Sequence, residues 1–494
     1  MATLDLQDAY FMVPIAAEDR IFLRFSFESN LYEFNCLPFG LSIAPWIFTK
    51  IMRPVLSCLR ERNFLSVAYL DDFLLLGNTF SSCLHNVKET SRLLTKLGFI
   101  INEQKSITIP VRCCKFLGFE LNSERMTVGV PRDKQLRTRD YISVFLKKQR
   151  VRIRELAQLI GTLISLCPAT KYGWVYTKEL ERHKYLALHL ANDDYDSHTH
   201  IPDIALEDLR WWHVNIINAY CPIRRLNFKK TIFTDASSTG WGAVCGEQRA
   251  HGQWSLDERT KHINYLELLA VLFGLQCLAA SDSDCELLLR VDNTTALAYV
   301  NRMGGIRFPD LNGLSRKIWN WCEARNIWLY ASYIRSSDNI EADAESRRIT
   351  SETEWSLSPR FYDRIVSAFG LPEIDLFASR PNAKCQSYVS WDRDPEAFAI
   401  DAFTLSWKQF FFYAFPPFAI LPRVLQKIAF DKASGILVVP YWKTQSWYPL
   451  FTSLLTKDPI VLGPHTNMLN CSNRVHPMGS SLTLVAGVLS GNPS

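Results

Sequence analysis

Two neighbouring aspartates interrupt a run of strand-forming apolar residues near the start of the chain. The tetrad Tyr69-Leu70-Asp71-Asp72 follows the segment 64–68 (FLSVA) and precedes the segment 73–77 (FLLLG). Two strand patterns around a short polar break predict a β-hairpin with both acids at its tip. Carboxylates beside apolar strands repel each other and lose solvation unless a cation neutralises them, and Mg²⁺ or Mn²⁺ suits such oxygen ligands. A solvated turn is the other interpretation of this pair.

Further motifs surround this tetrad in a fixed order. An apolar strand pattern containing an acid comes first, and a turn that opens a helix lies between it and the tetrad. The segments are 3–15 (TLDLQDAYFMVPI), 37–45 (LPFGLSIAP), 97–105 (LGFIINEQK) and 116–121 (FLGFEL). Together with the tetrad, this ordered set resembles motifs A to E of a reverse transcriptase palm.

The resemblance implies two-metal nucleotidyl transfer, with an RNA template, a DNA primer and dNTPs as partners and Mg²⁺ or Mn²⁺ as cofactor. It implies that Lys105 protonates the leaving pyrophosphate. It places Tyr10 under the incoming sugar, although a core aromatic is the other interpretation of that residue. The expected metal ligands are Asp5, Asp71 and Asp72, and the expected nucleotide contacts are Tyr10, Phe39, Gly40 and Tyr69.

A second set of acids follows in the order strand, helix, strand, helix. Asp235 and Asp292 end strand patterns, Glu267 lies in a mostly apolar helical run, and Asp343 lies in the segment 339–347 (NIEADAESR). For each acid taken alone, the other interpretation is a helix cap or a surface residue. Their order resembles the metal site of a ribonuclease H domain, which implies that all four acids bind metal and that RNA is cleaved in an RNA–DNA hybrid.

One residue departs from that family's pattern. Related retroelement enzymes carry a histidine in a mobile loop roughly ten residues before the last acid, and Tyr333 stands at that place. A neutral phenol does not replace an imidazole as a proton carrier near neutral pH. We therefore expect slower turnover with an unaffected metal site.

A third set of motifs occupies the segment from 354 to 455. The motifs are 355–359 (WSLSP), 369–370 (FG), 373–379 (EIDLFAS), 382–385 (NAKC), 415–418 (FPPF) and 435–440 (GILVVP). They resemble a phage-type adenine-N6 DNA methyltransferase, which implies a Rossmann-like sheet with Asp375 near the S-adenosylmethionine pocket. In that family the catalytic loop begins with Asp or Asn. Phe415 stands there and accepts no hydrogen bond, so we expect no methyl transfer and do not expect S-adenosylmethionine as a cofactor.

The order of the three segments resembles the polyprotein of DIRS-type retrotransposons, which integrate with a tyrosine recombinase. Gypsy-like elements share the first two segments, but a zinc-binding integrase follows them there and none is visible here. We expect an α+β and α/β multidomain chain. Its expected parts are a palm (1–121), a thumb or connection (122–228), a ribonuclease H-like domain (229–349), a Rossmann-like methyltransferase-related domain (352–458) and a tail or linker (459–494) toward a recombinase.

The resemblance also places a fingers subdomain before motif A, and four residues precede Asp5. We therefore expect an N-terminal truncation, and weak primer extension or none by this chain alone. The alternative function is that of a degenerate retroelement remnant, which binds nucleic acid without polymerising and keeps only ribonuclease H activity.

Composition limits the partners and the compartment. The net charge is only +5, so a nucleic-acid footprint must be local, and the segment 122–155 has ten Lys and Arg against four acids. Such a cluster suits a phosphate backbone, although a solvated face is its other interpretation. The 13 cysteines include no CxxC pair and suggest a reducing compartment. With no signal pattern and no long apolar stretch, we expect a cytoplasmic or nuclear protein, neither secreted nor membrane-bound. The polar segment 191–200 predicts a loop.

Overall fold

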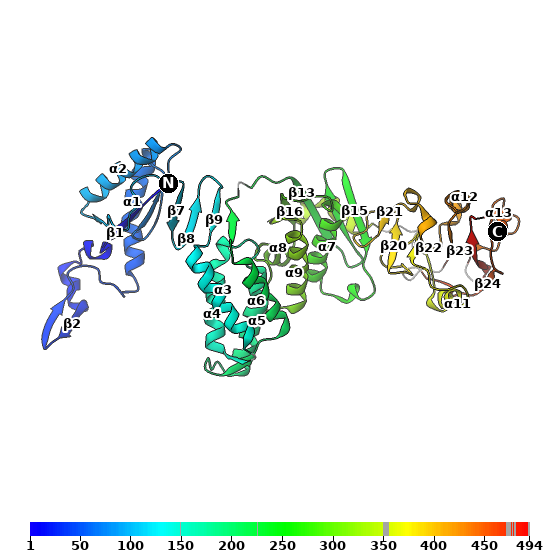
Figure 1. Cartoon of the computed structure of the whole chain (residues 1–494), viewed down its shortest axis with the longest axis horizontal. Coiled ribbons are helices and arrows are strands. Elements are labelled where there is room, and N and C mark those ends of the chain that lie inside the picture. Colours follow the sequence, from blue (N-terminus) through cyan, green and yellow to red (C-terminus); the bar gives the residue numbers. More distant parts are fainter. Residues whose placement is uncertain are drawn as a thin grey trace. The chain divides into compact units, whose positions relative to one another are not determined.

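The computed structural model describes residues 1–148, 150–224, 226–348, 355–470, 476, 478 and 481–492. The chain divides into two compact units, Met1–Arg225 and Leu226–Ser494 (Figure 1). The first unit contains the predicted palm and thumb. The second contains a five-stranded sheet and a seven-stranded sheet.

The first unit begins with a four-stranded antiparallel sheet in the order β4-β5-β1-β6. Its core joins apolar side chains of the strands to those of two helices, with Leu4, Phe48 and Phe73 almost completely buried. A short hairpin of exposed residues precedes the first helix. The elements are β1 (Ala2–Gln7), η1 (Ala9–Met12), η2 (Ala17–Leu23), β2 (Arg24–Phe27), β3 (Asn30–Glu33), α1 (Ala44–Glu61), β4 (Ser66–Tyr69), β5 (Asp72–Leu75), α2 (Phe80–Lys96) and β6 (Ile100–Ile101).

The rest of the first unit combines a second antiparallel sheet, in the order β12-β9-β8-β7, with four helices. The last strand follows the helices in the chain and pairs with β9, with Cys221 opposite Val128. The elements are β7 (Cys113–Phe116), β8 (Phe119–Asn122), β9 (Thr127–Gly129), α3 (Arg132–Lys147), β10 (Arg150–Arg152), α4 (Ile153–Leu166), η3 (Cys167–Ala169), η4 (Val175–Thr177), α5 (Lys178–Leu190), β11 (His198–His200), α6 (Asp203–Asn215) and β12 (Tyr220–Pro222).

The segment 191–200 is not a loop throughout. Its last three residues form β11, which pairs antiparallel with β10, so that Thr199 lies opposite the buried Val151. The polar composition of this segment shows no strand pattern. The strand forms because it pairs with a segment about 50 residues away, which no local pattern indicates.

The second unit begins with a sheet in the order β15-β14-β13-β16-β17. The first three strands in the chain are antiparallel neighbours, and β13, β16 and β17 run parallel. Helix α7 is apolar nearly all round and buried, as expected of a helix packed on a sheet. The elements are β13 (Lys230–Ala236), β14 (Gly240–Cys245), β15 (Gln248–Gln253), η5 (Glu258–Thr260), α7 (Ile263–Leu278), β16 (Glu286–Val291), α8 (Thr294–Asn301), α9 (Pro309–Glu323), β17 (Trp328–Tyr333), η6 (Ser336–Asp338) and α10 (Ile340–Ser346).

The seven-stranded sheet has the order β21-β20-β19-β22-β23-β26-β24. The first five are parallel, and the strand order reverses between β19 and β22, as in doubly wound folds. The elements are β18 (Ser356–Leu357), α11 (Pro359–Phe369), β19 (Ile374–Asp375), β20 (Ser387–Ser390), β21 (Ala399–Ile400), η7 (Ala402–Thr404), η8 (Trp407–Gln409), β22 (Phe411–Ala414), η9 (Phe418–Ile420), α12 (Leu421–Asp431), β23 (Ser434–Pro440), α13 (Tyr448–Ser453), β24 (Ile460–Leu462), β25 (Leu469–Asn470) and β26 (Leu484–Ser490).

The predicted tail, 459–494, differs from this structure and requires a correction. Its described residues include three strands, and β26 pairs with β23 from Ser434 opposite Ser490 to Pro440 opposite Leu484. The strand is apolar and buried along almost its whole length. A central strand buried on both faces is a continuous apolar run, so this segment is part of the fold and not a linker.

No helix in the described part of the chain combines the length and the apolar character that crossing a bilayer requires.

Candidate active sites

The predicted hairpin is confirmed, and it brings the first set of acids together. Strands β4 and β5 are joined by a two-residue turn, in which Leu70 adopts the left-handed conformation at φ 54°. Asp71 completes the turn, and Asp72 begins β5. In the neighbouring strand, Asp5 lies directly opposite Asp72, so three carboxylates gather at one end of the sheet.

The electrostatics of this site show crowding of negative charge. Burial raises the pKa of Asp72, and the nearby carboxylates of Asp71 and Asp5 raise it further. Lys105 lowers it. A cavity of about 140 Å³ is lined by Asp5, Asp72, Lys105 and Lys115, so Lys105 lies at this site and a second lysine accompanies it. A cation bound beside Asp72 favours the ionised form of its carboxyl group.

The residues expected to contact the nucleotide lie close to these acids. The Tyr10 ring packs against Phe39 at 5.2 Å and against the buried Phe48 at 5.3 Å, measured between ring centroids. Burial raises the pKa of Tyr10, followed by the charges of Asp71 and Tyr69, so these groups are neighbours. The core contact with Phe48 agrees with the second interpretation of Tyr10.

The exposed members of this group form its outer side. Phe39 and Tyr69 are both 60% exposed, which leaves their rings available to a ligand. Gly40 has φ +90°, and no heavy atom lies within 4 Å of the place that a Cβ would take, so its role is conformational rather than one of close approach.

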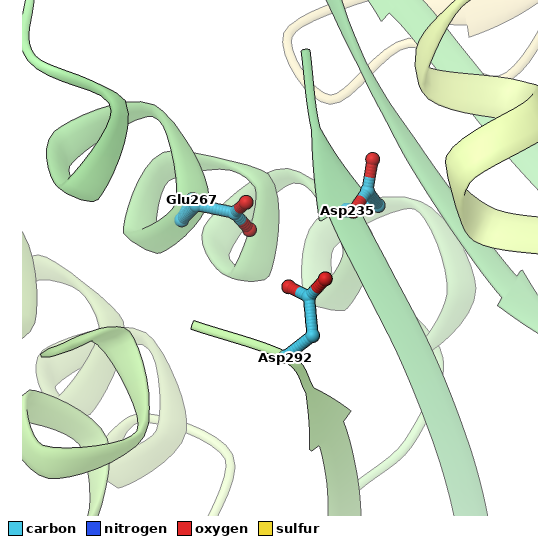
Figure 2. A group of neighbouring side chains, drawn as sticks. All are labelled: Asp235, Glu267 and Asp292. Atoms are coloured by element: carbon cyan, nitrogen blue, oxygen red, sulfur yellow. The ribbon is translucent and has the colours of Figure 1, made fainter. Parts of the chain in front are cut away.

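The second set of acids forms a tighter group. Asp235 lies in β13, Glu267 in α7, and Asp292 directly after β16, and Figure 2 shows the three side chains gathered from these elements. One carboxylate oxygen from each lies within 4.8 Å of the others. Because β13 and β16 are parallel neighbours, their carboxyl ends deliver two acids to the same edge of the sheet.

The surroundings of this group penalise its negative charge. Asp235 and Glu267 are each only 6% exposed. Burial, followed by the charges of Asp235 and Asp292, raises the pKa of Glu267 to about 9. Burial likewise raises the pKa of Asp235. Among the described residues, no partner donates a hydrogen bond to Oε2 of Glu267. An orphaned buried carboxylate oxygen beside two further carboxylates fits a divalent cation with oxygen ligands.

The structure does not bring Asp343 into this close group. Asp343 lies on α10, and its Oδ1 accepts hydrogen bonds from Nη2 of Arg347 at 2.7 Å and from Nε at 3.0 Å. Its charge still raises the pKa of Asp235, so it is a near neighbour of the group. The sequence reasoning missed Arg347, although its four-residue spacing from Asp343 on a helix is a signal for an ion pair.

Tyr333, in the position where a histidine was expected, is the last residue of β17 and is 50% exposed. It therefore stands on a strand that pairs with β16, opposite Val291, and not in a loop. Tyr333 therefore lies opposite the residue that directly precedes Asp292.

In the seven-stranded sheet, Asp375 ends β19 and is buried. It accepts hydrogen bonds from the backbone N–H groups of Phe377 at 3.3 Å and Lys384 at 3.1 Å, and burial raises its pKa to about 6. Phe415 directly follows β22 and is 9% exposed. An apolar side chain therefore stands at the carboxyl end of β22.

Comparisons with known proteins bear on the segment that contains the first of these sites. Residues 1–121 match the family model for reverse transcriptase (RNA-dependent DNA polymerase). The genome polyprotein of Petunia vein clearing virus is 22% identical over 423 residues, which are 80% of this chain and 18% of that polyprotein. The Tf2-7 transposon polyprotein of Schizosaccharomyces pombe is 24% identical over 296 residues, covering 55% of this chain and 20% of the polyprotein.

Among solved structures, a foamy viral protease-reverse transcriptase in complex with an RNA/DNA hybrid is 16% identical, with a TM-score of 0.41 over 67% of this chain and 43% of that one. The chain spans about a fifth of the length of the two polyproteins. Residues 1–121 are therefore a reverse transcriptase domain of the kind found in retroelement and viral polyproteins.

Proposed function

We propose that this chain is an RNA-directed DNA polymerase with ribonuclease H activity, which acts in the reverse transcription of a retrotransposon. The family match of residues 1–121 supports the polymerase part. The close carboxylate group of Asp235, Glu267 and Asp292 carries the ribonuclease H part, since it offers ligands for a cation in a buried position.

At the first site, Asp5, Asp71 and Asp72 are the proposed ligands of two Mg²⁺ ions. When bound, these ions supply activation of the primer 3′-hydroxyl and hold the triphosphate. Lys105 lines the same cavity as Asp5 and Asp72, which supports its proposed role as the proton donor to the leaving pyrophosphate. Phe39, Gly40 and Tyr69 shape the nucleotide pocket beside Tyr10.

Primer extension on an RNA template, with dNTPs and Mg²⁺ or Mn²⁺, tests this assignment. Asp72→Asn removes one charged ligand without changing the size of the side chain, so incorporation should fall by about 100-fold or more. Asp19→Asn is the matched control, because Asp19 is an exposed acid of the same domain. Equal incorporation by wild type and Asp72→Asn would contradict the polymerase proposal, and no incorporation by a folded wild-type chain would favour the alternative, a remnant without polymerase activity.

At the second site, the proposed metal ligands are Asp235, Glu267, Asp292 and Asp343. A bound Mg²⁺ supplies an activated water for attack on the RNA strand of a hybrid. The chain's own carboxylates fix the position of that cation. Since Arg347 holds Asp343, recruitment of the fourth ligand involves breaking this ion pair.

The basic residues around β10 favour an RNA or DNA backbone as the partner of the first unit. Arg150 and Arg152 are exposed on β10, directly opposite His200 and His198 on β11. Other members of the basic segment 122–155 are neutralised locally, as in the pairs Arg137–Asp133 and Lys148–Glu155. The proposed footprint is therefore narrower than the composition of the segment suggests.

For the seven-stranded sheet we propose a methyltransferase-related domain of a DIRS-type element that transfers no methyl group. The reversal of strand order supports the relationship, and Phe415 supports the loss of activity. We expect no incorporation when the protein is incubated with labelled S-adenosylmethionine and duplex DNA. Incorporation that disappears in Asp375→Ala would contradict this proposal.

A further inference from the structure

Two loops of the seven-stranded region contact the five-stranded region of the same unit. One loop, 379–381, comes shortly after β19, and the other, 391–395, directly follows β20. The backbone N–H of Arg380 in the first loop donates to Oδ2 of Asp394 in the second at 2.9 Å. Oδ1 of the same carboxylate accepts from the hydroxyl of Tyr388 in β20 at 2.6 Å. The two loops are therefore fixed to each other and to the sheet.

Arg380 reaches the five-stranded region through a buried ion pair. Its Nη1 donates to Oε1 of Glu258 at 2.7 Å, its Nη2 donates to the second oxygen, and the two side chains are only 12% and 18% exposed. Burial works to raise the pKa of Glu258, but the hydrogen bonds and the charge of Arg380 bring it below its ordinary value, so the pair is ionised. Charge-assisted hydrogen bonds of this kind are strong, and removal of one partner alone leaves an uncompensated buried charge.

The two loops also contact α7, the helix that carries Glu267. The Arg380 guanidinium lies 4.7 Å from the ring centre of Phe273, and Nη1 of Arg393 donates to the backbone carbonyl of Cys277 at 3.1 Å. Both contacted residues lie in the second half of α7. The last four carbonyl groups of a helix have no partner within it, so an arginine at this end satisfies a carbonyl and complements the helix dipole. The loops therefore hold the carboxyl end of this helix.

The path from the loops to α10, the helix that carries Asp343, passes through His251 of β15. Nδ1 of His251 lies 3.1 Å from Oε2 of Glu345 on α10. Its other ring nitrogen, Nε2, lies 3.9 Å from Oδ2 of Asp392 in the second loop. The side chains of His251 and Glu345 are both buried. One buried ring therefore lies between α10 and the loop that follows β20.

Helix α10 is short and depends on its neighbours for its position. It has seven residues, and an isolated helix of fewer than about 12 residues is marginal in water. Its backbone packs closely on β14, since a Cβ at Gly242 would lie 2.4 Å from the carbonyl oxygen of Ala342. A contact that fixes α10 therefore also fixes the place of Asp343.

The polar contacts between the two regions surround a cavity of about 190 Å³. It is lined by His251 and Arg348 on the five-stranded side and by Arg380 and Arg393 on the seven-stranded side. Side chains that border an open space lose dispersion contacts there, so the interface depends more strongly on its direct polar contacts. A change in one or two of these contacts should therefore have a measurable effect.

We propose that the seven-stranded region is a platform for the ribonuclease H site. Its two loops hold α7 and α10, and with them Glu267 and Asp343, in the positions that bind metal. This assigns a function to a region for which we expect no methyl transfer. Arg380, Arg393 and His251 are then positioning residues, since they act through the two helices and not on the reacting atoms. The effect on cleavage rests on the proposed function, whereas the effect on the helices does not.

Hydrogen exchange of the whole chain, without metal or nucleic acid, tests whether the two helices are held. The double variant Arg380→Ala/Glu258→Ala removes both charges of the ion pair, so no buried charge is left unpaired and the fold should be kept. Circular dichroism and thermal unfolding check the fold. We expect amide exchange at least about fivefold faster than in wild type in 263–278 and in 340–346, because both helices lose a restraint.

A second variant changes only the seven-stranded side. Arg393→Ala leaves one backbone carbonyl without its donor, and it should also speed exchange in 263–278. Arg364→Ala is the matched control and should exchange like wild type, because Arg364 is an exposed arginine of α11 that does not line the cavity. Faster exchange confined to 375–395 in both test variants, or no change in either, would overturn the proposal.

Cleavage of the RNA strand of a hybrid at increasing Mg²⁺ concentration tests the consequence for the site. The double variant should need at least about tenfold more Mg²⁺ for half of its maximal rate, while its KM for the hybrid stays within about twofold of wild type. A loss of folded protein alone would instead lower the rate at every Mg²⁺ concentration. An equal Mg²⁺ requirement in the two proteins would overturn the positioning role. If the folded wild type does not cut, the proposed function fails, and hydrogen exchange still decides whether the helices are held.

Discussion

Glu267 shows how a single buried carboxylate connects stability with function. It is surrounded by apolar residues of α7 and by two further acids, and its pKa is raised to about 9. An acid with a raised pKa binds its proton more tightly in the folded chain than in the unfolded chain. The stability of the metal-free protein therefore falls as pH rises from the ordinary value near 4.5 toward 9. A bound divalent cation reverses this cost by favouring the ionised form.

Replacing this carboxyl group by an amide should therefore stabilise the metal-free protein and abolish its response to metal. We expect Glu267→Gln to raise the melting temperature at pH 8 by about 2–6 °C, corresponding to about 1–2 kcal/mol. The difference should shrink at pH 5, where the folded wild type holds its proton. Thermal unfolding in EDTA and in Mg²⁺, followed by circular dichroism, measures both effects. A Glu267→Gln variant that is less stable than wild type in EDTA at pH 8, or equally stabilised by Mg²⁺, would disprove this account of the site.

At the scale of elements, the sequence pattern correctly predicted the features that depend on residues close together in the chain. The hairpin around Leu70 and Asp71 was predicted and confirmed, because two apolar strands flank a turn that needs only two residues. Helix α1 follows the predicted turn at 37–45 in the same way. The order of strand and helix acids also indicated the group of Asp235, Glu267 and Asp292, since parallel strands deliver their carboxyl ends to one edge.

The elements that sequence reasoning missed depend on distant partners. Strand β26 was expected to be part of a tail, because no residue pattern close to it in the sequence indicates its position between β23 and β24. Strand β11 is polar and short, and only its pairing with β10 defines it. Pairing and packing over long separations decide these features, and periodicity does not report them.

The assignment of β26 leads to a direct prediction about chain length. Ending the chain after residue 458 removes β24 and β26, which exposes the apolar edge of β23 and part of its core. We expect this truncated protein to aggregate or to be cleaved by protease at least about tenfold faster than wild type, because an unpaired apolar strand cannot be shielded. Ending the chain after residue 491, which leaves β26 whole, is the control. Equal protease resistance of the 458 truncation and wild type would show that β26 does not stabilise the sheet.

At the scale of the whole molecule, the two groups of acids lie on two different sheets. Asp5, Asp71 and Asp72 lie at the end of an antiparallel sheet in the first unit, where Asp5 faces Asp72 across neighbouring strands. The second group lies on a mixed sheet in the second unit, and its ligand oxygens are already close enough to share one ion. In the proposed function, the first site copies an RNA strand and the second site removes it.

Cleavage of a labelled RNA strand in an RNA–DNA hybrid tests the central claim most directly. Wild type and the control Asp257→Asn, which alters an exposed acid outside the group, should cut the RNA in Mg²⁺ or Mn²⁺ and not in EDTA. Asp292→Asn should keep its fold, because the side chains have equal size, and should lose at least about 100-fold in rate through loss of a charged ligand. Tyr333 in place of a histidine predicts a slow wild-type rate rather than none. If the folded wild type does not cut, or if Asp292→Asn cuts as fast as wild type, the acids of the second unit are not a ribonuclease H site.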